Sequence, residues 1–190
     1  MTTNVILCGV GGQGTLLASN ILAETALKSG FDVKKSEVHG MAQRGGSVVS
    51  QVKFGKEVRS PLIRKGEADI LISFEQLEAL RWADYTRPHG LIITSNQKIL
   101  PMSVSAGNSK YPENIIEILK NHFPKVLSFD VLAEATALGN PKCVNIILMG
   151  ILAKNLPLFN KDAWIEVICE MIPPKILELN KKAFERGWEL

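Results

Sequence analysis

The sequence predicts an α/β fold, a three-layer, mostly parallel, Rossmann-like sheet followed by C-terminal helices. Three observations support this class. An apolar strand near the N-terminus runs directly into a glycine-rich turn and then a helix. Short apolar runs of strand length alternate with helical patterns through the first two thirds of the chain. From Asn145 onward, only helical periodicity remains.

The N-terminal elements form a predicted β-α-β unit. Val5–Cys8 is a short buried strand, and leucines and isoleucines then recur at helical spacing through Thr15–Ser29. Gly30 stands where a helix C-cap glycine belongs, and Asp32–Ser36 follows as a second strand. Strands joined by such a helix take a right-handed crossover, so we expect these two strands to be parallel.

The middle of the chain predicts further strands and helices. Ser47–Phe54 alternates in the manner of a half-buried strand, and the turn at Gly55-Lys56 indicates Glu57–Ser60 as its hairpin partner. The next elements are expected to be strand Ala68–Ser73, helix Phe74–Trp82, strand Gly90–Thr94, a helix from Pro112, strand Lys125–Phe129, and helix Val131–Leu138 capped by Asp130. Helices Asn145–Lys154, Lys161–Met171 and Pro174–Arg186 complete the chain.

Length and charge limit the class of protein. A chain of 190 residues is expected to be a single domain, residues 1–190, with a helical C-terminal part from about 145 to 190. The 22 basic and 19 acidic residues leave a net charge of only +3 without a basic run, which gives no indication of a nucleic-acid partner. The longest mostly apolar stretch, Cys143–Ala153, is far too short to span a membrane, so no membrane association is expected.

The cysteines indicate a reducing compartment. Cys8, Cys143 and Cys169 are far apart, odd in number and each next to apolar residues, so we expect three buried free thiols and a cytoplasmic protein. Because the sequence has no Cys-x-x-Cys pair, we expect neither a metal site nor an iron–sulfur cluster on this chain.

The glycine-rich turn from Gly9 to Gly14 is the first candidate site. Between a strand and a helix, Gly9, Gly11, Gly12 and Gly14 would bring backbone N–H groups close to an anion, and the amide of Gln13 can donate or accept. Three interpretations stay open: a bound phosphate or carboxylate, tight strand–helix packing without a ligand, and NAD. For NAD, Asp32 comes too early and Glu37 leads into the next motif. No Lys-Ser/Thr follows, which excludes a Walker A loop.

A second motif extends from Ser36 to Gly46 and includes His39, Arg44, Gly45 and Gly46. We expect this loop to lie beside the glycine turn, because ligands of open α/β sheets bind at the carboxyl ends of the strands. There His39 would transfer a proton or donate a hydrogen bond, Arg44 would clamp a carboxylate or phosphate, and Gly45-Gly46 would add an anion nest. An ordinary loop histidine and a structural arginine salt bridge remain the alternatives.

The two motifs, as Gly9–Ser19 and Ser36–Val48, resemble the gamma-type subunits of the 2-oxoacid:ferredoxin oxidoreductases. The His-Gly-Met-Ala-Gln residues before Arg44 are similar to the arylpyruvate (indolepyruvate) type of this family. The resemblance covers roughly residues 4 to 153. It continues through Ser60–Ile63, Gly66–Asp69, Phe74–Arg81 and Asn145–Gly150.

The resemblance implies a non-autonomous enzyme subunit. Its alpha-type partner would carry thiamine diphosphate with magnesium and the iron–sulfur clusters. Together they would oxidatively decarboxylate an arylpyruvate to an acyl-coenzyme A and pass electrons to ferredoxin. This subunit would then form one wall of the active site and help to hold coenzyme A. It would have no catalytic residue of its own, but His39 and Arg44 would contribute to the shared site. A pyruvate- or 2-oxoglutarate-type gamma subunit and a stand-alone nucleotide-binding module are the alternatives.

Overall fold

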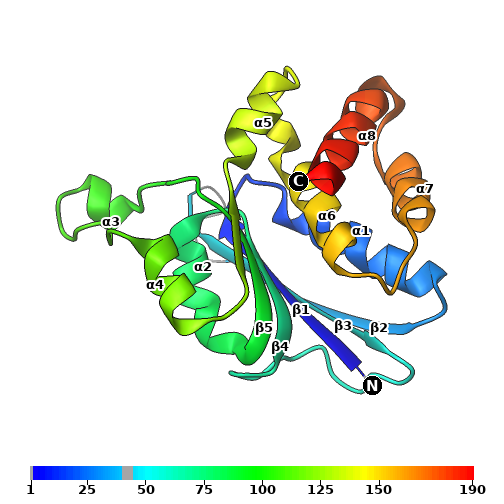
Figure 1. Ribbon diagram of the computed structural model, residues 1–190, viewed down its shortest axis with the longest axis horizontal. Coiled ribbons are helices and arrows are strands. Elements are labelled where there is room, and N and C mark those ends of the chain that lie inside the picture. The colour runs from blue at the N-terminus through cyan, green and yellow to red at the C-terminus, as the bar shows by residue number, and fades with distance from the viewer. Residues whose placement is uncertain (1, 40–44) are drawn as a thin grey trace.

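A six-stranded sheet lies between two layers of helices in the computed structural model, which describes residues 2–39 and 45–190 (Figure 1). The strands are β1 (Thr2–Val10), β2 (Asp32–His39), β3 (Ser47–Gly55), β4 (Ala68–Ser73), β5 (Thr86–Ser95) and β6 (Val126–Phe129). The helices are α1 (Thr15–Lys28), α2 (Gln76–Trp82), α3 (Met102–Ser105), α4 (Ile115–His122), α5 (Val131–Ala137), α6 (Val144–Asn155), α7 (Lys161–Met171) and α8 (Pro174–Glu189). Two 3-10 turns, η1 (Ala83–Tyr85) and η2 (Pro141–Cys143), complete the described elements.

The sheet is mixed but mostly parallel. Its strand order is β2-β3-β1-β4-β5-β6, in which β1, β4, β5 and β6 are parallel neighbours and β3 is antiparallel to both β1 and β2. The predicted fold class is therefore confirmed. β1 and β2 run in the same direction, as predicted, but they are not neighbours because β3 lies between them.

The hairpin partner of β3 was predicted wrongly. β3 pairs with the strand before it, from Asp32 opposite Gly55 to His39 opposite Val48, so the second motif connects two antiparallel strands. Glu57–Ser60 forms no strand. Its Val58 is buried and donates its N–H to the Asp32 carboxylate (N–Oδ2 2.8 Å). Since β3 hydrogen-bonds along its whole length to both β1 and β2, it has no free edge for a third partner.

Helices cover both faces of the sheet (Figure 1). α1 and α5–α8 lie on one side, and α2 and α4 lie on the other. Alternate residues of the central strand β1 therefore enter separate cores. Val5 and Leu7 pack with the larger helical layer, whereas Ile6 and Cys8 pack with α2 and α4. All four are fully buried, as expected for a strand covered on both faces.

Local capping sets several helix boundaries. Asp130 caps α5 as predicted, with its Oδ1 accepting the Ala133 N–H at 3.1 Å. The helix expected from Pro112 begins later, at Ile115, because Asn114 has a left-handed backbone (φ 56°). The short α3 was not predicted and contributes no buried residue. It projects from the body of the molecule beside α4 (Figure 1).

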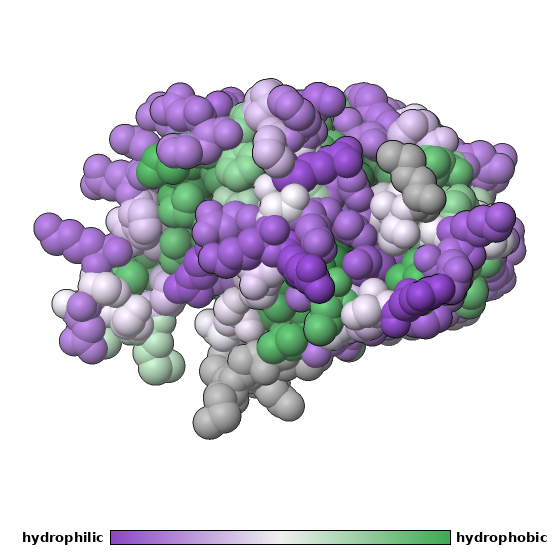
Figure 2. Space-filling model, turned by 90° about the horizontal axis from the view of Figure 1, so that it is seen from below, coloured by the Kyte–Doolittle hydropathy of each residue, from purple (hydrophilic) through white to green (hydrophobic). Residues whose placement is uncertain are grey.

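The C-terminal helices follow the prediction. α6 is buried along almost its entire length, between the sheet and α8, which explains its uninterrupted apolar sequence. α7 spans the predicted residues, and α8 extends three residues further than expected. Among the described residues, no helix is both long and apolar enough to cross a bilayer. Hydrophilic side chains cover much of the face on the side of the N-terminus, with apolar patches between them (Figure 2).

The cysteines are free, but they are not all buried. Cys8 and Cys143 are buried as predicted, whereas Cys169 is half-exposed. α7 turns Trp164, Val167 and Ile168 toward the core, and Cys169 lies one residue beyond that buried stripe. The prediction of three buried thiols is therefore wrong for Cys169.

Candidate functional site

The glycine turn joins the end of β1 to the start of α1, as the sequence predicts. Gly12 (φ 104°) and Gly14 (φ 80°) take left-handed conformations, which residues with a Cβ rarely adopt. At Gly14 a Cβ would lie 2.5 Å from the side-chain nitrogen of Asn145, whereas at Gly12 it would meet open space. A Cβ at Gly9 would approach that of Phe74 to 2.9 Å. Packing therefore explains Gly9 and Gly14, whereas the space in front of Gly12 is open to a ligand.

Gln13 supports the turn from within. Its Oε1 accepts the Val10 N–H at 2.8 Å, and its Nε2 donates to the Phe74 carbonyl at 2.9 Å and to the Gln97 side chain at 3.1 Å. One amide thus ties together the segments that follow β1, β4 and β5. Because both of its N–H hydrogens are used inside the protein, Gln13 contributes to the site by shaping it.

The end of the second motif lies against the glycine turn, as predicted. Gly11 donates its N–H to the Gly46 carbonyl at 2.8 Å, and Gly45 donates to the Gly11 carbonyl at 3.5 Å. The backbone of His39 ends β2 opposite Val48. Residues 40–44, including Arg44, and the side chain of His39 lie outside the part of the chain that the structure describes. Their roles therefore stay predictions.

Two clefts flank the glycine turn. One, of about 400 Å³, is lined by Gly12, Gln13, Gly14, Gln97, Leu132, Pro141, Lys142 and Val144. The other, of about 320 Å³, is lined by Val10, Gly11, Gly12, Gly14, Thr15, Leu16 and Val48. The first cleft lies at the N-terminal end of α1 and has the basic residue Lys142 in its lining, an arrangement suited to a phosphate or carboxylate.

Two polar residues at these clefts were not identified from the sequence. Lys142 stands in an ordinary loop after Gly139-Asn140, and no spacing in the sequence relates it to the glycine turn. Thr15 is 3% exposed, and its hydroxyl has no hydrogen-bond partner within the described residues. Its place directly after Gly14 was the one available signal, because a hydroxyl there can reach into a helix N-terminus.

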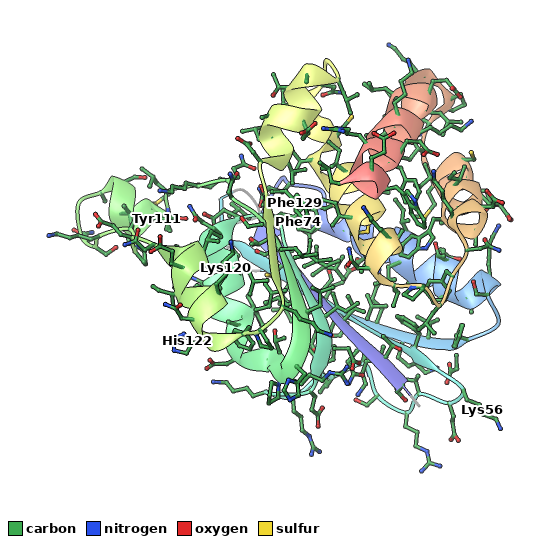
Figure 3. All side chains as sticks on the ribbon, in the orientation of Figure 1. Lys56, Phe74, Tyr111, Lys120, His122 and Phe129 are labelled. Carbon is green, nitrogen blue, oxygen red and sulfur yellow. The ribbon has the colours of Figure 1, made fainter. Side chains whose placement is uncertain are left out.

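Buried acidic residues lie beneath this end of the sheet, at the start of α2. Glu75 is 1% exposed, caps α2 through the Glu78 N–H (2.9 Å), and accepts a hydrogen bond from the Tyr111 hydroxyl at 2.5 Å. Tyr111 lies where the α3 segment returns to α4, and Phe74 lies near the centre, by the ends of the strands (Figure 3). Burial raises the pKa of the Tyr111 hydroxyl, and its hydrogen bond to Glu75 raises it further.

The neighbouring Glu78 is also buried. Desolvation raises the pKa of its carboxyl above the usual range, although the Ser47 hydroxyl and Arg81 act in the opposite direction. Burial likewise raises the pKa of the Cys8 thiol, which donates to the Glu78 carbonyl. Sequence reasoning predicted the helix here but gave neither Glu75 nor Glu78 a role.

A further cleft lies away from this site. It measures about 570 Å³ and lies at the opposite edge, where β1, β4 and β5 begin, near Thr2, Asp69 and Arg87. Ligands of open α/β sheets bind at the carboxyl ends of the strands. We therefore place the candidate site at the glycine turn, where a strand, a glycine-rich turn, a helix N-terminus and two clefts come together. No metal-binding group of histidine, cysteine or acidic residues exists among the described residues.

Fold and site together define an α/β protein with a glycine-rich turn between its first strand and first helix. The chain belongs to the pyruvate ferredoxin/flavodoxin oxidoreductase family, which it matches over residues 4–190. The family resemblance seen in the two motifs is thereby confirmed, and it extends through the C-terminal helices.

Individual relatives agree with this assignment. The chain is 42% identical over 189 residues to the indolepyruvate oxidoreductase subunit IorB of Pyrococcus horikoshii, covering 97% of this chain and 93% of that protein. Its fold is similar to the gamma subunit of a keto/oxoacid ferredoxin oxidoreductase from Geobacter sulfurreducens, with a TM-score of 0.76, 21% identity, and coverage of 100% and 95% of the two chains. It also matches 30% of a longer chain, the 2-oxoglutarate:ferredoxin oxidoreductase of Magnetococcus marinus, with 99% of this chain covered, a TM-score of 0.74 and 17% identity.

Proposed function

We propose that this chain is the small subunit of an indolepyruvate-type 2-oxoacid:ferredoxin oxidoreductase, acting in the cytoplasm. The observation that carries the proposal is the glycine turn with its two clefts, in a chain 42% identical to an indolepyruvate oxidoreductase subunit over nearly its full length. Within such a complex an arylpyruvate is oxidatively decarboxylated, the acyl group is transferred to coenzyme A, and electrons pass to ferredoxin.

The division of labour follows from the residues present. From the family resemblance we assign thiamine diphosphate, magnesium and the iron–sulfur clusters to an alpha-type partner subunit. The wide spacing of the three cysteines in this sequence is consistent with clusters held by the partner. This chain would form one wall of the shared active site with its glycine turn and the second motif. His39, at the end of β2, and Arg44, between β2 and β3, would reach that site.

We further propose that the cleft beside Lys142 receives phosphate groups of coenzyme A. Gly12 leaves open space in front of the turn, Gly14 is the N-cap of α1, and Lys142 brings a positive charge to the same cleft. These are groups that suit a phosphate. The Magnetococcus marinus protein of similar fold has been solved with coenzyme A bound, which is consistent with this assignment.

Substitution of Lys142 tests the coenzyme A assignment. In the reconstituted complex, Lys142→Gln should raise the KM for coenzyme A about fivefold with little change in kcat, because one exposed charge–phosphate contact is lost. The control is Lys182→Gln, since Lys182 is an exposed lysine of α8 away from the clefts. An unchanged KM at low ionic strength would remove Lys142 from the coenzyme A site.

The substrate is tested by turnover of the complex. Coexpression with a thiamine-diphosphate subunit, followed by assays with indolepyruvate, phenylpyruvate, pyruvate and 2-oxoglutarate, should give the highest kcat/KM with an arylpyruvate. Preference for pyruvate or 2-oxoglutarate would establish the alternative gamma-type function. If the isolated chain binds a nucleotide tightly and forms no complex, the stand-alone binding module is correct instead.

A further inference from the structure

Two separate sequence motifs meet at a buried carboxylate. Glu78 belongs to the Phe74–Arg81 segment, and its side chain is 3% exposed. Its Oε2 accepts a hydrogen bond from the hydroxyl of Ser47 at 2.5 Å, and its Oε1 pairs with Arg81 at 2.7 Å. Ser47 is the first residue of β3 and directly follows the glycine pair of the second motif. Glu78 therefore joins α2 to the loop that lies against the glycine turn.

The contact continues into the glycine turn itself. The residue before Ser47 is Gly46, whose carbonyl accepts the N–H of Gly11 at 2.8 Å. A short path thus runs from the Glu78 carboxylate through the Ser47 hydroxyl and one peptide unit to the middle of the turn. It reaches the turn from the α2 face of the sheet, opposite the face covered by α1.

Stability alone does not account for a carboxylate at this position. Removing a charge from water costs several kcal/mol, and the partner Arg81 is 46% exposed, so the ion pair recovers only part of that cost. The neighbouring Glu75 is explained by its capping of α2 and its contacts to Ile99 and Tyr111. Among the described residues, Ser47 is the side chain outside α2 that hydrogen-bonds the Glu78 carboxylate.

We propose that Glu78 is a positioning residue that holds Gly45-Gly46 against the glycine turn through Ser47. It touches no ligand. It fixes the distance between the turn and the end of the second motif, and so sets the shape of the cleft lined by Gly11, Gly12 and Val48. This cleft shares Gly12 and Gly14 with the cleft beside Lys142 that we propose for coenzyme A, so a shift of the turn alters both. Its effect on coenzyme A rests on the proposed function, whereas its effect on the turn does not.

Ser47 offers the cleaner substitution, because Glu78→Gln also disturbs the pair with Arg81. In Ser47→Ala, the free subunit should show amide exchange at Gly11 accelerated about tenfold, as expected when a hydrogen bond to a charged group is lost. Ser47→Thr keeps a hydroxyl in a strand and should restore slow exchange. Ser29→Ala is the matched control, since Ser29 loses one hydrogen bond (to Thr25, 2.7 Å) at the far end of α1.

The reconstituted complex supplies the second measurement. Ser47→Ala should raise the KM for coenzyme A about fivefold with kcat nearly unchanged, and Ser47→Thr should return the KM to the wild-type value. Gly11 exchange that is unaffected by Ser47→Ala overturns the positioning role. Faster Gly11 exchange with an unchanged KM supports the positioning role and contradicts the coenzyme A part of the proposed function.

Discussion

Burial determines the protonation of individual residues near the glycine turn. Cys8 and Glu78 lie on the α2 side of β1, and desolvation is the largest influence on the pKa of each. In both, burial favours the neutral form. For Cys8 this means an unreactive thiol at neutral pH. For Glu78 it links the free energy of unfolding to pH.

The expected pH dependence follows from the raised pKa of Glu78. Its pKa in the folded chain lies above the ordinary value of 4.5, so the folded state binds this proton more tightly than the unfolded state. The contribution of Glu78 to the free energy of unfolding should therefore fall as pH rises from about 4.5 through the raised pKa. One proton sets an upper limit of about 1.4 kcal/mol per unit of pH on the slope of this contribution. Glu78→Gln should flatten this part of the profile.

Urea denaturation of wild type and Glu78→Gln at several pH values measures this difference directly. Glu117→Gln serves as the control, because Glu117 lies exposed on α4. Parallel profiles for wild type and Glu78→Gln would show that Glu78 titrates normally in the folded chain. The same measurements show whether burying the ionised Glu78 carboxylate destabilises the folded chain, as assumed for its positioning role.

Among the elements, α6 and α8 make the closest contact between helices. Gly150 on α6 and Gly187 on α8 face one another, and both are buried. A Cβ at Gly150 would lie 2.1 Å from the Phe184 carbonyl oxygen, and one at Gly187 would lie 2.0 Å from that of Ile147. These atoms belong to backbone that cannot move without separating the helices. The contact explains why glycine, a poor helix former, occupies two helix interiors.

Gly187→Ala tests this contact, because the local and tertiary effects have opposite signs. In an exposed helix, Gly→Ala stabilises by about 1 kcal/mol. Here we expect a loss of about 3 kcal/mol or more, since α8 must shift away from α6 and leave poorly filled space. Thermal or urea unfolding gives the difference, with Lys182→Ala on the exposed side of α8 as a control. A stabilised Gly187→Ala chain would mean that the two helices pack less closely than described.

Sequence patterns predicted the limits of helices better than they predicted which strands pair and which residues meet in the fold. The limits of α1 and α7 were predicted to within a residue, since spacing and caps are local properties. The position of β3 between β1 and β2 was not predicted, because strand pairing depends on contacts between residues distant in sequence. The positions of Lys142 and Glu78 near the glycine turn were not predicted for the same reason, because only the tertiary fold brings them there.

At the scale of the whole molecule, the candidate site lies at one end of the sheet. Helices bury both faces of the central strands, and the glycine turn, the end of the second motif and the start of α2 meet where the parallel strands finish. The glycine turn and its neighbour were predictable because each is a contiguous motif with a known backbone use. The sequence did not predict that Gly9 and Gly14 are needed for packing whereas Gly12 faces open space. That difference depends on contacts with Phe74 and Asn145, which are distant in the sequence.

The proposed sharing of one active site between two subunits has a direct consequence for the isolated chain. The purified subunit should fold, as expected of a chain with two continuous hydrophobic cores, yet show no oxidation of indolepyruvate with coenzyme A and an electron-accepting dye. Activity should appear on titration with the thiamine-diphosphate subunit and saturate at a fixed ratio, because both chains contribute to one site. Circular dichroism before mixing separates a folded, inactive subunit from an unfolded one. Turnover by this chain alone, or a complex whose activity is independent of it, would contradict the proposed division of labour.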